Sequence, residues 1–183
     1  MNEIKQQWTK FSTRLNSIWH EQALWLFLLL VLGHFSEHVV QIYQIYIMGW
    51  LPSEAGGILG LKFPFLVTSE YLHIFYNGFT WLGVMLLRHG LKGQARTWWN
   101  VTILFASWHL FEHILLQYQY MTGDFWFGRT VQTGIGQLWF PRPELHFVYN
   151  LLVFTPMMLA YAYHFYSTTQ KQIPVLGKRQ IAA

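Results

Sequence analysis

The chain has 183 residues, of which 53% are apolar and only 11% charged, against about 25% charged in an average soluble domain. This composition excludes a disordered chain. The net charge of +4 also excludes a nucleic-acid-binding arm, because it arises from scarce acids (8) rather than abundant bases (12). With no cysteine, the chain has no disulfide, iron–sulfur cluster or thiolate metal site, and its length fits one domain.

Residues 1–21 have the pattern of an amphipathic helix. Apolar side chains recur at helical spacing and basic side chains lie between them. The apolar positions are Trp8, Phe11, Leu15, Ile18 and Trp19, and the basic ones are Lys5, Lys10 and Arg14. We predict that this segment lies on the cytoplasmic membrane surface. The same pattern also fits a helix packed on a partner protein.

Four apolar stretches follow, at about 23–48, 67–87, 97–120 and 145–166. Each is close to the roughly 20 residues that cross a bilayer as a helix. They predict an all-α integral membrane protein, with a four-transmembrane-helix domain over residues 22–167 and a tail over 168–183.

The basic residues are divided unequally between the two sides of such a bundle. Nine flank the side that holds both termini and the link between the second and third stretches, and three lie on the other side. By the positive-inside rule, both termini are expected in the cytoplasm, which makes this a multi-pass protein of the inner cell membrane.

The two outer links, about 49–66 and 121–144, are apolar and rich in glycine. We expect them to fold back over the outer mouth of the bundle or to form a docking surface for a partner subunit. The expected partners are therefore the lipid bilayer and such a subunit, and no nucleic acid.

The two halves of the chain resemble each other. Several polar positions recur in the same order at offsets of 73 or 75 residues. The pairs are His34 with His109, Glu37 with Glu112, His38 with His113, His73 with His146, Asn77 with Asn150, and Tyr43-Gln44 with Tyr118-Gln119. We therefore predict a parallel two-helix repeat, with a first half at about 23–88 and a second half at about 97–167.

Ionisable side chains within or beside the apolar stretches are the candidate site. They are His34, Glu37, His38, Glu70, His73, His109, Glu112, His113, Glu144 and His146. Residues at i, i+3 and i+4 share one face of a helix, so each His-x-x-Glu-His triplet presents three such groups together. At about 1.5 Å per residue in a core about 30 Å thick, all six histidines lie in the outer half. Because charged groups within a membrane are costly, we predict that they converge on metal ions.

Imidazole and carboxylate ligands without sulfur suit iron, copper, zinc or manganese, and we expect iron. Glu70 and His73 have Glu-x-x-His spacing, and the pattern resembles the ligand set of ferritin-like di-metal carboxylate bundles. Locally, each His-x-x-Glu-His triplet is similar to the inverted zinc-protease motif, in which two histidines bind zinc and the glutamate is the base. Asn77, Asn150, Tyr76 and Tyr149 are candidates for supporting roles behind the ligands.

The primary hypothesis is a di- or multi-nuclear metalloenzyme, an oxidoreductase that acts on a lipid-soluble substrate or O₂. One alternative is a haem b electron-transfer subunit of a larger complex, with axial ligands such as His34 and His109, or His38 and His113. Another is a metal or proton transporter, because histidine and glutamate chains also relay charge. A fourth interpretation is structural, in which the polar side chains join the helices by hydrogen bonds.

Overall fold

A computed structural model describes residues 2–180, and every regular element in that range is helical. The all-α prediction is therefore confirmed for the described residues. The long helices are α1 (Asn2–Leu15), α2 (His20–Tyr46), α5 (Glu70–Leu87), α6 (Gly93–Thr122) and α7 (Arg142–Gln180). The short ones are α3 (Gly57–Lys62), α4 (Phe65–Thr68) and the 3₁₀ turns η1 (Arg88–Gly90) and η2 (Gly136–Leu138).

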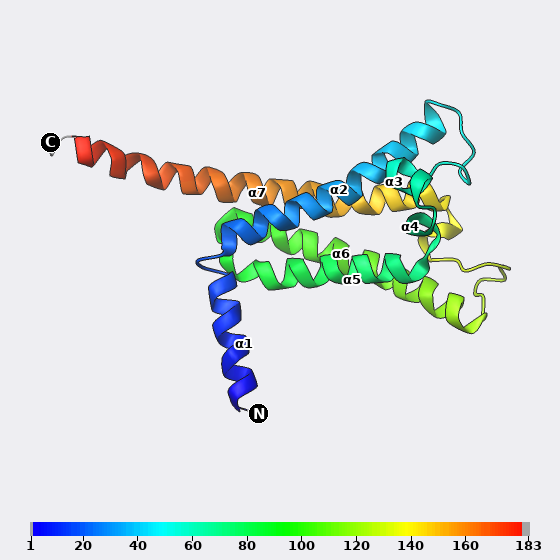
Figure 1. Ribbon diagram of the computed structural model, residues 1–183, viewed down its shortest axis with the longest axis horizontal. Helices are drawn as coiled ribbons and strands as arrows, with labels where there is room; N and C mark the ends of the chain where they lie inside the picture. Colours follow the sequence, from blue (N-terminus) through cyan, green and yellow to red (C-terminus); the bar gives the residue numbers. More distant parts are fainter. Residues whose placement is uncertain (1, 181–183) are drawn as a thin grey trace.

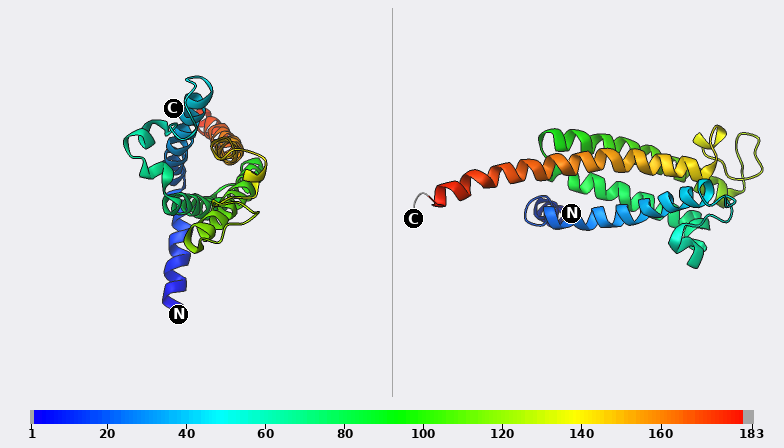
Figure 2. Two further views of the ribbon diagram at one scale, coloured as in Figure 1. Left: turned by 90° about the vertical axis from the view of Figure 1, so that its right-hand side faces the viewer. Right: turned by 90° about the horizontal axis from the view of Figure 1, so that it is seen from above.

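Helices α2, α5, α6 and α7 form a bundle, and α1 extends away from it (Figure 1). Within the bundle α2 and α6 run in one direction, and α5 and α7 run in the other (Figure 1). Helix α6 packs along both α5 and α7, whereas α2 packs mainly along α7 and has less contact with α5. The end-on view shows the resulting ring of four helices, with α3 and α4 on the outside of α2 and α5 (Figure 2).

Two helices of the described chain are long and apolar enough to cross a membrane, namely His20–Tyr46 and Arg142–Tyr166. They carry the first and fourth of the predicted stretches. Helices α5 and α6 carry the second and third and are not among these two, so the four-span bundle stays a prediction.

The inner half of the bundle is filled by apolar side chains. Leu24, Val84, Trp99 and Met157 have no exposed surface, and they come from all four bundle helices. The indole Nε1 of Trp99 donates a hydrogen bond to the Val84 carbonyl oxygen at 2.7 Å, which satisfies the one polar group of that ring. This core separates the polar end of the bundle from the end where α1 lies.

Two predicted boundaries differ from the structure. The helix expected over 1–21 ends at Leu15, because the Asn16 side chain donates to the Leu86 carbonyl and accepts from the Gly90 amide. These bonds tie the turn before α2 to the link between α5 and α6. The tail expected from residue 168 continues as part of α7 to Gln180, while Met1 and residues 181–183 lie outside the described residues.

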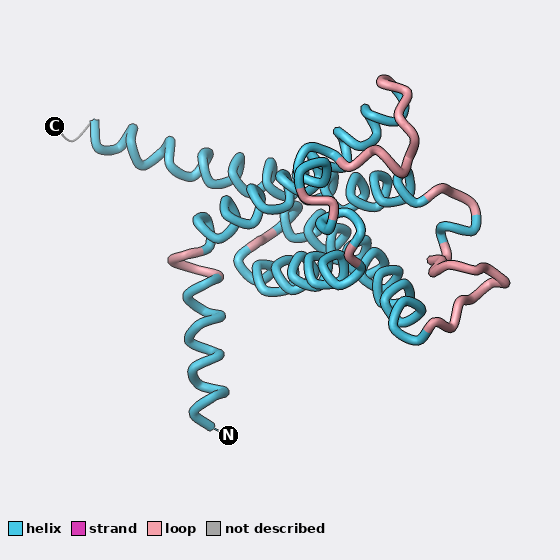
Figure 3. Tube along the Cα trace, turned by 45° about the vertical axis from the view of Figure 1, so that its right-hand side comes forward, coloured by secondary structure: helices cyan, strands magenta, loops and turns pink. Residues whose placement is uncertain are grey.

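The two outer links fold back onto the bundle, as predicted. They form the loops beyond α2 and α6 in Figure 3, together with α3, α4 and η2. Gln44 holds the first link, because its side chain accepts from the Gly57 amide and donates to the Gly57 carbonyl. Gln119 holds the second link in the same way, through the amide and carbonyl of Thr133.

Candidate metal centre

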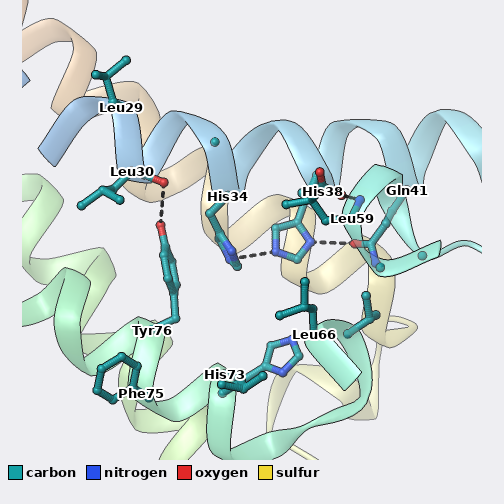
Figure 4. A pocket seen from close by; sticks show the side chains of 16 residues that line it. Leu29, Leu30, His34, His38, Gln41, Leu59, Leu66, His73, Phe75 and Tyr76 are labelled. Atoms are coloured by element: carbon teal, nitrogen blue, oxygen red, sulfur yellow. Dashed lines mark hydrogen bonds between the residues drawn. The ribbon is translucent and has the colours of Figure 1, made fainter. Parts of the chain in front are cut away.

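All six histidines of the predicted site meet in the half of the bundle next to the two long links, called here the outer half, and together they are called the histidine cluster. Helix α2 supplies His34 and His38, α5 supplies His73, α6 supplies His109 and His113, and α7 supplies His146. Neighbouring rings have centroids 4.6 to 5.8 Å apart, in a chain of contacts that links all six. His34 is half-buried and the other five are buried. Figure 4 shows the part of the cluster that α2 and α5 contribute.

The tightest group is the second-half trio of His109, His113 and His146. The Nε2 atom of His113 lies 3.2 Å from that of His109 and 3.1 Å from that of His146. The ligand atoms of the three residues all lie within 4.8 Å of one another, so this group could hold a metal ion. In the first half, the Nε2 atoms of His34 and His38 lie 3.0 Å apart.

Backbone carbonyl oxygens determine which ring nitrogen of His73 and of His146 carries the proton. Nδ1 of His73 lies 2.8 Å from the Ser69 carbonyl oxygen, and Nδ1 of His146 lies 3.1 Å from that of Arg142. A carbonyl oxygen only accepts, so each Nδ1 is the donor, and the Nε2 of a neutral ring then holds a free lone pair. That lone pair is what a metal binds.

His38 is oriented in the same way by a side-chain amide. Its Nδ1 lies 2.8 Å from Oε1 of Gln41, whose Nε2 donates to the Ala55 carbonyl oxygen. The His38 Nε2 lone pair therefore faces His34, on the side away from Gln41 (Figure 4). One residue in each of α2, α5 and α7 thus has its metal-binding nitrogen turned into the cluster.

Hydrogen bonds between the rings can account for only some of the close nitrogen–nitrogen contacts in the cluster. An imidazole nitrogen has one position in the plane of its ring, which holds either one proton or one lone pair. Two other nitrogens converge on Nε2 of His113, so at most one of these two contacts is a hydrogen bond. A cation that receives the three lone pairs would satisfy all of them at once.

The distances in the cluster also suit a shared ion. Imidazole nitrogens bind zinc at about 2.0–2.1 Å, so two that share one ion lie about 2.9 Å apart at octahedral angles and about 3.4 Å apart at tetrahedral angles. Three Nε2 pairs fall between these limits, His34–His38 at 3.0 Å, His113–His146 at 3.1 Å and His109–His113 at 3.2 Å, and the ligand atoms of the second-half trio all lie within 4.8 Å of one another.

Two of the predicted carboxylate ligands are hydrogen-bonded to the outer links. Glu37 accepts from the backbone amides of Ile58 at 2.7 Å and Leu59 at 3.0 Å. Glu112 does the same in the second half, where the amides of Ile135 and Gly136 donate to it at 2.9 and 3.0 Å. Each carboxylate thus anchors the link of its own half above the cluster, at equivalent positions of the repeat.

The other two carboxylates join helices. Glu70 forms a salt bridge with Arg142 and also accepts from Gln132, which ties the start of α5 to the start of α7. Glu144 accepts from the hydroxyl group of Tyr46 at 2.7 Å, at the outer end of α2. Within the described residues, none of the four glutamates has a hydrogen bond to a cluster histidine, and their role as metal ligands stays a prediction.

The predicted supporting residues lie next to the cluster. Asn77 and Asn150 each donate to the carbonyl oxygen of the histidine one turn earlier, at 2.9 and 2.8 Å. Tyr76 stacks on the ring of His34 with centroids 3.8 Å apart. The ring centroid of its counterpart Tyr149 lies 5.3 Å from that of His109, and the Tyr149 hydroxyl group donates to the Glu112 carboxylate instead.

Several residues of the site were missed by sequence reasoning. Gln41 and the backbone carbonyls of Ser69 and Arg142 orient three rings, and the Arg142 side chain pairs with Glu70. Their spacing offers a signal, because Gln41 follows His38 by three residues, and the residues of the two accepting carbonyls precede their histidines by four. No protein-family model, no curated protein and no solved structure matches this chain.

Proposed function

We propose that this chain is an integral-membrane metalloprotein in which all four bundle helices span the bilayer. Helices α5 and α6 support this proposal through their outward faces. Phe75 and Leu82 on α5 are 71% and 47% exposed, and Leu104 and Ile114 on α6 are 64% and 48% exposed. Apolar surface this extensive suits lipid rather than water. The distribution of basic residues then puts both termini in the cytoplasm and the histidine cluster in the outer half of the membrane.

The cluster is proposed to bind two metal ions, one for each half of the repeat. The second-half trio holds one. The other is assigned to the first-half trio of His34, His38 and His73 by analogy with the repeat, because among the described residues the ligand atoms of only the second-half trio all lie within 4.8 Å of one another. The observation that carries this proposal is the convergence of two nitrogens on Nε2 of His113, which protons alone cannot satisfy. Six imidazoles without sulfur suit iron, and copper, zinc and manganese are the other candidates.

An oxidoreductase acting on a lipid-soluble substrate or O₂ is the activity that suits this site best. Iron or copper supplies one-electron and O₂ chemistry when bound by such ligands. The chain's own contribution is to orient three of the imidazoles with Nε2 directed into the cluster and to exclude water from the inner half of the bundle. Within this proposal, Glu37 and Glu112 hold the outer links over the metals.

The other interpretations have less support from the cluster. A haem must lie between its two axial rings, and two of the candidate axial rings are already packed against other rings of the cluster, His38 against His146 and His113 against His73 and His146. A transporter needs a polar path to the inner end, where Leu24, Val84, Trp99 and Met157 are fully buried. Purely structural hydrogen bonding does not account for three nitrogens meeting at His113.

Elemental analysis of the purified full-length protein tests the proposal. We expect about two transition-metal ions per chain in the wild type, as in other two-metal sites. The variant His113→Ala removes the nitrogen shared by two neighbours and should lose metal. The matched control is His89→Ala, because His89 is exposed and lies in η1 at the opposite end of the bundle.

The results separate the alternatives. Metal loss in His113→Ala with full content in His89→Ala supports the proposal. Equal metal content in both variants, or a wild type that binds no metal after incubation with ferrous, cupric or zinc salts, overturns it. A Soret absorption band in the wild type would identify haem instead.

A further inference from the structure

A cavity of about 430 Å³ lies between α2 and α5 beside the first-half trio. Helices α3 and α4 flank it, and its side chains are shown in Figure 4. Most of them are apolar, including Leu29, Leu30, Leu66, Leu72 and Phe75. The polar ones, His34, His38, Glu37, Gln41 and His73, are gathered at the cluster. A volume of this size falls within the range of small-molecule sites, about 300–1,000 Å³.

The cavity at the corresponding position of the second half is much smaller. The corresponding cavity, beside His109, His113 and His146, is about 10 Å³. The sequence explains the difference, because Gly33 of the first half corresponds to Trp108 of the second at the offset of 75 residues. Trp108 lies against Tyr149 and donates to its hydroxyl group at 3.1 Å. In the first half, a side chain added at Gly33 would meet nothing within 4 Å of its Cβ atom.

The cavity faces the surface that the proposed function assigns to lipid. It lies between α2 and α5, which have less contact with each other than α2 has with α7. Leu29 and Phe75, which line it from these two helices, are 64% and 71% exposed. A molecule dissolved in the bilayer can therefore reach the cavity sideways, without crossing the aqueous phase.

Tyr76 bounds the cavity next to the cluster. It reaches from α5 to α2, where its hydroxyl group donates to the Leu30 carbonyl oxygen at 3.3 Å, and its ring covers one face of His34 (Figure 4). The polar side chains that line the cavity at this end are therefore the histidines with Glu37 and Gln41, whereas the tyrosine hydroxyl is bonded to α2.

We propose that this cavity binds the hydrocarbon chain of a bilayer amphiphile and presents one carbon of it to the first-half trio. The inference rests on the proposed membrane placement and metal site, and it names their substrate class. An apolar space with one polar end selects a chain over a polar solute, because hydrocarbon gains from burial whereas an unpaired polar group loses. In this proposal the two halves of the repeat differ in role, because the first-half trio is open to substrate and Trp108 closes the second half.

Photolabelling of the full-length protein in phosphatidylcholine vesicles tests this inference. The probe is palmitic acid with a diazirine at mid-chain, and labelled peptides are identified by mass spectrometry with and without excess oleic acid. In the wild type we expect labelling on the cavity segments of α2 and α5 that oleic acid removes. The variant Gly33→Trp should reduce this labelling to the level of the oleic-acid sample, because it recreates the filled second half.

Two further variants keep the test decisive. Gly78→Trp is the matched control, since a side chain at Gly78 also meets nothing within 4 Å and Gly78 does not line the cavity. Leu30→Phe copies Phe105 of the second half and narrows the cavity if Gly33→Trp does not fold. Labelling that oleic acid leaves unchanged, or that persists in both cavity variants, overturns the inference. Elemental analysis of the same samples reports on the metal site separately, so failure of one proposal is distinguishable from failure of the other.

Discussion

The replacement of Glu112 by alanine separates its observed contacts from its predicted role as a metal ligand. The carboxylate is 3% exposed and accepts from the amides of Ile135 and Gly136 and from the Tyr149 hydroxyl group. In Glu112→Ala these three donors lose their acceptor, and residues 135 and 136 are released from α6, while Gln119 still holds Thr133.

The expected loss of stability follows from the two backbone hydrogen bonds that Glu112 accepts. A hydrogen bond to a charged acceptor contributes about 1.5–3 kcal/mol, and Ile135 and Gly136 are only half-buried, so water replaces part of it and the lower value applies. Two such bonds amount to about 3 kcal/mol, which is roughly a hundredfold in the local opening equilibrium of the link. Glu37→Ala should have a smaller effect, because Ile58 and Leu59 are exposed and water reaches their amides.

Amide hydrogen exchange of the protein in vesicles measures this opening. We expect roughly a hundredfold faster exchange at residues 135 and 136 in Glu112→Ala, a smaller increase at 58 and 59 in Glu37→Ala, and unchanged exchange in the inner core. Metal content is measured in parallel. Unchanged exchange together with lost metal would refute this reasoning and identify Glu112 as a ligand.

Two further predictions concern metal retention and helix packing. Imidazole must be neutral to bind a metal, so acidification should release the ions, and a return to neutral pH with added metal should restore them. Elemental analysis after dialysis measures both steps. Retention of the metal at acidic pH would count against histidine ligands. Gly83→Ala should lower the midpoint of thermal unfolding in detergent, because its Cβ would overlap the Phe27 ring at a cost of about 1–3 kcal/mol. Gly78→Ala, where the Cβ meets nothing, should raise the midpoint, because alanine stabilises a helix by up to about 1 kcal/mol relative to glycine. Equal midpoints for the two variants would contradict this account.

The meeting of the six histidines could be predicted because helical geometry is local and regular. His34 and His38 share a face of any helix that contains them, and the repeat places His109 and His113 at the same depth. The all-helical fold followed equally from the long apolar stretches.

The direction of the glutamates could not be predicted in this way. Glu37 shares a helix face with His34, but its flexible side chain bonds to the amides of Ile58 and Leu59, more than 20 residues later in the chain. The end of α1 has a similar origin, since Asn16 bonds to Leu86 and Gly90. Such choices depend on where distant backbone lies, which periodicity does not specify.

The sequence contains part of the reason for the cavity. The difference between Gly33 and Trp108 is present in the sequence, as is the larger Phe105 in place of Leu30. Whether neighbouring helices close around a small residue depends on their packing, and here the weak contact between α2 and α5 leaves the space open.

The packed inner half of the bundle also determines how the cluster is supplied. Because the side chains there leave no exposed surface at Leu24, Val84, Trp99 or Met157, a hydrated ion has no path from that end. Under the proposed function, a metal ion would then reach the cluster from the opposite end, past the links that Glu37 and Glu112 hold. A protein that inserts the ions would dock on the periplasmic or extracellular side of the proposed topology.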